Sequence, residues 1–163
     1  MSQAGVISSS GGSGGAGAIP WNFITTINTT SGSSVSFTSA QIVNYNNVVF
    51  VFSVNTSLGN GLQISGSTNG GVSYTVGGIP SFQNTITNPF GIAVTSTGNG
   101  WIQISNSNLN ITHTFIGHYN LLGFTSVAYT GYFSASVQLN AFQFTTVGGD
   151  SFTGGSISMY GFG

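Results

Sequence analysis

Apolar and polar residues alternate with a period of two along much of the chain after Trp21. The clearest example spans residues 155–160, where Ile157 and Met159 alternate with serine and tyrosine. This alternation is typical of a β-strand that buries one face. Residues 48–54 are apolar at every position but one, which predicts a central strand that is covered on both faces. Because Glu and Lys are absent and Leu is scarce, helices are disfavoured and an all-β fold is expected.

Short strands are predicted from these runs and from the turn residues between them. They span residues 21–30, 35–38, 47–54, 62–65, 73–76, 92–95, 101–105, 111–119, 126–137, 141–147 and 156–160. The Asn-Gly pairs at 69–70 and 99–100 are predicted to form hairpin turns, because Asn-Gly accepts the positive φ angles that tight turns need. About ten short antiparallel strands at this spacing predict a jelly-roll-like β-sandwich. The last strand should lie beside earlier strands, with Ile157 and Met159 facing the core.

Residues 1–19 are predicted to form a flexible N-terminal arm, followed by a β-sandwich domain over residues 20–163. Residues 8–19 are almost entirely Gly, Ser and Ala, a composition typical of flexible linkers. Val6 and Ile7 precede this linker and are candidate docking residues, because the linker lets them reach another protein. A disordered tail without a partner is the alternative.

The chain carries a single charged side chain, Asp150, among 163 residues, with no Lys and no Arg. Nucleic-acid binding depends on cations that neutralise phosphates, so this function class is excluded. Binding to anionic membrane surfaces needs the same cations. The longest apolar run, residues 48–52, is far shorter than the roughly 20 residues that span a bilayer, so no membrane insertion is expected. A net charge near zero favours association between protein molecules. We therefore expect a homo-oligomer, the alternative being a protein that meets few others in its surroundings.

The candidate catalytic or metal-binding residues are His113, His118 and Asp150, and none of them forms a recognisable site. The two histidines are five positions apart in a predicted strand and should point to opposite faces, so they cannot hold one metal ion within a subunit. A lone carboxylate is insufficient for glycosidase chemistry or for a calcium site. We therefore expect a buried histidine at 113, a turn or cap role for Asp150, and no catalytic residue, metal or cofactor.

Trp101 and Tyr74 are the candidate ligand-binding residues. Both lie near predicted hairpin tips, where an exposed aromatic ring would provide a platform for a sugar ring to stack on. The alternative for Trp101 is a core position at the start of a strand.

Four segments resemble the β-domains of bacteriophage virion proteins that form tail fibres, tail tips or capsid decorations. They are residues 21–40, 46–57, 62–74 and 152–163, and the last of them, FTGGSISMYGFG, is the most similar. The resemblance implies a structural component of the virus particle that acts by assembly, located in the virion. It also implies a homotrimer, by analogy with fibres, and an N-terminal arm that docks to other virion proteins.

Two other functions stay open from the sequence. One is a receptor- or glycan-binding adhesin on a phage or cell surface, whose partner would be a host-surface glycan. The other is an extracellular filament subunit.

Overall fold

The computed structural model describes residues 20–38, 40–59, 61–80, 91–92, 97–121, 125–133 and 136–163. The predicted arm, with its candidate docking residues Val6 and Ile7, lies outside these residues. Strands β1 to β11 and one short 3-10 helix, η1 (Ile42–Asn44), make up the regular structure of the described part. Each predicted strand shares at least one residue with an observed strand, and the predicted antiparallel β-sandwich is confirmed.

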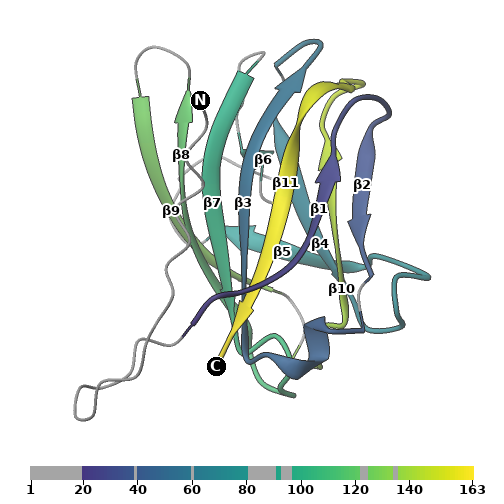
Figure 1. The fold of residues 1–163 in the computed structure, drawn as a ribbon, viewed down its shortest axis with the longest axis vertical. Coiled ribbons are helices and arrows are strands. Elements are labelled where there is room, and N and C mark those ends of the chain that lie inside the picture. Colours follow the sequence, from purple (N-terminus) through teal and green to yellow (C-terminus); the bar gives the residue numbers. More distant parts are fainter. Residues whose placement is uncertain are drawn as a thin grey trace.

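The larger sheet has six antiparallel strands and forms one side of the sandwich (Figure 1). Its order is β1 (Asn22–Asn28), β11 (Phe152–Phe162), β3 (Asn47–Thr56), β7 (Thr97–Ser105), β8 (Thr114–Leu121) and β9 (Thr125–Phe133).

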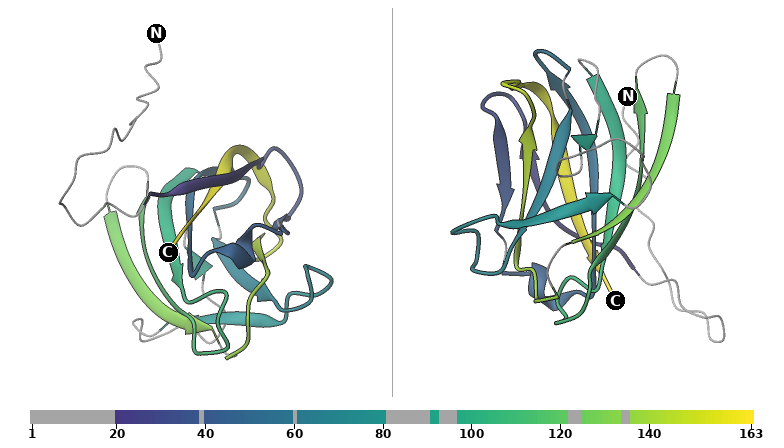
Figure 2. Two further views of the ribbon diagram at one scale, coloured as in Figure 1. Left: turned by 60° about the horizontal axis from the view of Figure 1, so that its bottom comes forward. Right: turned by 180° about the vertical axis from the view of Figure 1, so that it is seen from behind.

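The smaller sheet has three strands in the order β4 (Leu62–Ser67), β10 (Ala141–Thr146) and β2 (Ser34–Phe37). Strand β5 (Val76–Pro80) pairs with both β9 and β4 and so connects the two sheets, as Figure 2 shows from two further directions. The two-residue strand β6 (Gly91–Ile92) pairs with β4.

Phenylalanine side chains fill the space between the two sheets. Phe50 of β3 packs edge-on against Phe37 of β2 and Phe144 of β10, with ring centroids 5.1 Å apart in each pair. Phe142 contacts the same ring at 5.4 Å. Edge-to-face packing is a favoured arrangement of aromatic rings, and each buried ring contributes about 1.5–3 kcal/mol through burial alone. Strands from distant parts of the sequence are therefore held together by one aromatic core.

Strand β11 has the orientation that its alternating pattern predicts. Ile157 and Met159 are fully buried in the core, whereas the intervening serines lie on the outer face. The strand lies between β1 and β3, so it is paired along both sides, and β1 forms the edge of the larger sheet.

The two Asn-Gly predictions have different outcomes. Asn69 and Gly70 lie in the connection between the paired strands β4 and β5, as predicted, although this connection spans the eight residues 68–75. The prediction for Asn99 and Gly100 is wrong, because both lie inside β7, where they pair with β3 on one side and β8 on the other. Pairing on both sides outweighs the local preference of Asn-Gly for a turn.

Candidate functional site: a groove on the outer face of the larger sheet

In-register side chains cross the outer face of the larger sheet in rows. One row contains Ser158 of β11, Val51 of β3, Trp101 of β7 and His118 of β8, each paired with the next. Side chains two residues apart on a strand share a face. The neighbouring row on this face therefore contains Ser156, Ser53 and Asn99, which are also paired in order.

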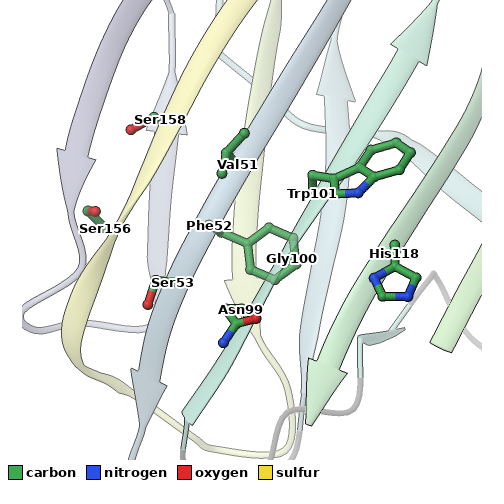
Figure 3. Close-up of a pocket in the computed structure, with 9 residues that line it drawn as sticks. All are labelled: Val51, Phe52, Ser53, Asn99, Gly100, Trp101, His118, Ser156 and Ser158. Carbon is green, nitrogen blue, oxygen red and sulfur yellow. The ribbon is translucent and has the colours of Figure 1, made fainter. Parts of the chain in front are cut away.

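A groove of about 440 Å³ lies along these two rows (Figure 3). We call it the Trp101 groove. Its nine lining residues are Val51, Phe52, Ser53, Asn99, Gly100, Trp101, His118, Ser156 and Ser158. The space beside the indole ring exists because Ser53, Ser156 and Ser158 on the same face have small side chains.

Trp101 lies on the outer face and is 37% exposed, so it is not a core side chain. Val51 beside it is 41% exposed. The prediction that this central strand is covered on both faces is therefore wrong at Val51, although Val49 on the same face is fully buried. On β11, Val49 is paired with the large residue Tyr160, whereas Val51 is paired with a serine.

The other predicted ligand-binding residue, Tyr74, does not lie with Trp101. It is half-buried in the β4–β5 connection, and its ring lies against Gly71. It does not line the Trp101 groove. The structure therefore separates the two aromatic residues that the sequence suggested as a pair.

His118 lines the groove, and no Lys, Arg, Asp or Glu lines it. The groove therefore presents an aromatic ring, an imidazole, an amide and several hydroxyl groups. In the described part of the chain, no group of three or more His, Cys, Asp or Glu residues could hold a metal ion.

Asp150 has the loop-capping role that was predicted for it. The carboxylate is buried, and its Oδ1 atom accepts hydrogen bonds from the Ser57 hydroxyl and the Leu58 amide, each at 2.8 Å. The Ser151 amide donates to the same oxygen at 2.7 Å. The side chain therefore joins the β3–β4 connection to the β10–β11 connection.

His113 is fully buried, as predicted, and lies just before β8. Its Nδ1 atom lies 2.7 Å from the carbonyl oxygen of Asn106, and its Nε2 atom contacts the carbonyl oxygen of Val137. Both ring nitrogens are therefore used in holding two connecting segments together, so this histidine has a structural role.

Sequence reasoning missed an aromatic cluster at the β1 edge of the larger sheet. The rings of Trp21 and Phe162 are stacked with centroids 5.9 Å apart, and Tyr160 contacts Trp21 at 6.2 Å and Phe23 at 5.7 Å. We call these four residues the edge cluster. Trp21 is 55% exposed and Phe23 is 61% exposed. The sequence did contain a signal for this cluster. Aromatic residues occur at alternate positions in two segments, at 21 and 23 and again at 160 and 162.

No helix among the described residues is long and apolar enough to cross a membrane. No protein-family model, curated protein or solved structure significantly matches the chain.

Proposed function

We propose that the chain is a structural component of a virus particle, of the kind found in phage tail fibres, tail tips or head decorations, and that it acts by assembly. The exposed edge cluster is the observation that carries this proposal. Large apolar side chains exposed together on a protein surface mark sites of interaction. Residues that pack against another protein at such a site are frequently aromatic.

The backbone of β1 supports the same function. Among the described strands, β1 pairs with β11 alone, so its other side is an open sheet edge. Natural proteins protect such edges with charged side chains, bulges or a covering segment. This chain has no Lys or Arg to place there, and β1 has a single register shift, between Phe23 and Thr25. A neighbouring subunit that covers β1 and the edge cluster provides the protection that charge does not.

The partners in this proposal are identical copies of the chain, three by analogy with fibres, and other virion proteins bound through residues 1–19. The location is the virion. An extracellular filament subunit would use the same contacts between copies, without the virion partners.

The proposed assembly is tested by sedimentation velocity on the full chain and on a Trp21→Ser/Phe23→Ser variant. We expect the full chain to form an oligomer and the variant to shift toward the monomer. Val72→Ser is the matched control, because Val72 is also apolar, is 85% exposed and lies away from β1 in the β4–β5 connection. A monomeric full chain, or equal effects of the variant and the control, would overturn the assembly function.

A second experiment tests the arm. Removal of residues 1–19 should leave the contacts at β1 in place and abolish binding to the rest of the particle. Sedimentation of the trimmed protein with and without isolated particles separates the two contributions, and retained binding to particles contradicts the docking role of Val6 and Ile7.

A receptor-binding module is the second candidate function. The Trp101 groove favours it, because it places an exposed aromatic ring among polar groups on a face that the smaller sheet does not cover. This function and assembly are compatible, since the groove and the edge cluster are formed by different residues.

A further inference from the structure

The indole ring of Trp101 provides an apolar platform within the groove. Figure 3 shows the Trp101 and His118 rings on neighbouring strands and on the same side of the sheet, with Val51 on the other flank of Trp101. An aromatic face offers a flat apolar surface, and the indole N–H adds a hydrogen-bond donor. A ligand that stacks here needs one flat apolar face of its own.

Polar groups that both donate and accept hydrogen bonds lie next to this platform. Asn99 is two residues from Trp101 on β7 and so shares its face, and Ser53 is paired with Asn99 across the sheet. Ser158 lies in the same row as Trp101. Hydroxyl and amide groups each combine donor and acceptor functions, so this set matches a ligand with several hydroxyl groups.

The charge of the groove restricts the ligand further. There is no Lys or Arg in the chain to pair with a carboxylate, a phosphate or a sulfate. The only acidic side chain, Asp150, is buried in the loops and cannot pair with a cation in the groove. A charged ligand would lose hydration without gaining a Lys, Arg, Asp or Glu partner in the groove. The groove is therefore suited to an uncharged ligand.

The volume of the groove fits a small ligand or one unit of a longer one. Small-molecule sites typically enclose about 300–1,000 Å³, and the groove, at about 440 Å³, lies in this range.

We propose that the Trp101 groove binds an uncharged sugar unit of a glycan. The sugar ring stacks on Trp101, and its hydroxyl groups form hydrogen bonds with Asn99, Ser53 and Ser158. This inference rests on the second of the proposed functions, receptor binding, and does not depend on assembly.

The proposal is tested with a glycan array that presents neutral glycans beside their sialylated and sulfated forms, probed with the full chain. We expect binding to a subset of neutral glycans and no gain from the acidic groups. Trp101→Ala should lower the signal on those glycans at least tenfold. Tyr132→Ala is the matched control, because Tyr132 is also an exposed aromatic residue of the larger sheet but belongs neither to the groove nor to the edge cluster.

Two further measurements separate a lost site from a lost fold. Ser53→Phe fills the groove at an exposed strand position and should abolish binding while the melting temperature stays close to that of the wild type. In Trp21→Phe, Trp101 is the sole tryptophan, so its fluorescence should change on titration with the neutral glycan that binds best on the array.

The possible results distinguish the proposal from the function on which it rests. Tryptophan-dependent binding to acidic glycans alone overturns the assignment of an uncharged sugar but leaves receptor binding in place. Binding that survives both Trp101→Ala and Ser53→Phe moves the site elsewhere on the protein. The absence of binding to every glycan overturns the sugar site and removes the support for the receptor-binding function.

Discussion

Gly155 shows how one residue fixes the local path of β11. Its φ angle is +96°, and a Cβ atom at this position would overlap the carbonyl oxygen of Ser53 on the neighbouring strand β3. Both the backbone angle and the close approach therefore require glycine. The register between the two strands also shifts just before this position, between Phe152 and Gly154.

Gly155→Ala should lower the free energy of unfolding by about 3 kcal/mol or more, because it combines an unfavourable backbone angle with a steric clash. Gly70→Ala is the control: its φ angle is +73°, but nothing lies within 4 Å of the added Cβ. The control should cost only about 1 kcal/mol, the penalty of the angle alone. Urea unfolding of both variants measures the difference, and equal losses would contradict the close approach to Ser53.

Asp150 is the second residue whose chemistry predicts a measurable effect. Asp150→Ala should destabilise the protein by about 2–3 kcal/mol, because it removes the acceptor of the part-buried Leu58 amide and of the Ser57 hydroxyl and the nearer of the two acceptors of the Ser151 amide. Ser57→Ala removes one hydroxyl donor to the same carboxylate and a second, longer acceptor of the Ser151 amide, which keeps the Asp150 carboxylate, and should cost about 1 kcal/mol. Chemical denaturation that ranks the two variants in the opposite order would show that the carboxylate is not the centre of this loop contact.

The structural roles of Asp150 and His113 could be predicted because each lacks the partners that a catalytic or metal site requires. The exposure of Val51 and Trp101 could not be predicted from the sequence. It depends on which residues lie beside them on β11 and β8, and this information is not contained in the sequence of β3 or β7 itself.

At the scale of elements, β11 is the strand on which the larger sheet depends most. It is paired along its length with β3 and is also paired with β1. Its removal therefore leaves β1 without a partner strand and β3 without its partner on that side. Deletion of residues 153–163 should abolish cooperative unfolding, as measured by circular dichroism during heating. Deletion of residues 1–28 removes the predicted arm and one edge strand, β1, and should leave a cooperative transition at a lower temperature. A cooperative transition in the first variant would contradict the central role of β11.

Strand positions were predictable because a half-buried strand imposes a period of two on its residues. The ends of strands were less predictable, as residues 97–105 illustrate. The turn-forming pair Asn99-Gly100 lies inside β7, where β3 and β8 provide backbone partners on both sides. A local signal cannot report such long-range pairing.

For the whole molecule, the near absence of charge predicts that stability is almost independent of salt. Salt acts on proteins chiefly by screening charges, and the Debye length falls from about 30 Å at 0.01 M to about 3 Å at 1 M. With one charged side chain to screen, the melting temperature should change by no more than about 3 °C over this range.

A variant with Ser53→Lys and Asn99→Lys is the control for this experiment. These two positions are paired directly across β3 and β7, and like charges placed opposite each other destabilise a sheet. Its melting temperature should rise with added salt. A comparable rise in the wild type would contradict the uncharged surface inferred from the sequence.

The order of the strands was beyond sequence reasoning, and the groove follows from that order. Its lining residues come from β3, β7, β8 and β11, which adjoin one another only in the folded sheet. The sequence indicated Trp101, but the serines and Asn99 that surround it are indistinguishable from the many other polar residues of the chain until the strands are aligned.

The pairing of β1 with β11 also determines how the molecule responds to tension. Asn22 pairs with Gly161, so the first and last described strands meet where the described chain begins and ends. Because the two strands are antiparallel, a force that pulls Pro20 away from Gly163 loads one backbone hydrogen bond at a time. The strands would peel apart from that end like a zipper, at a lower force than if all their bonds were sheared together.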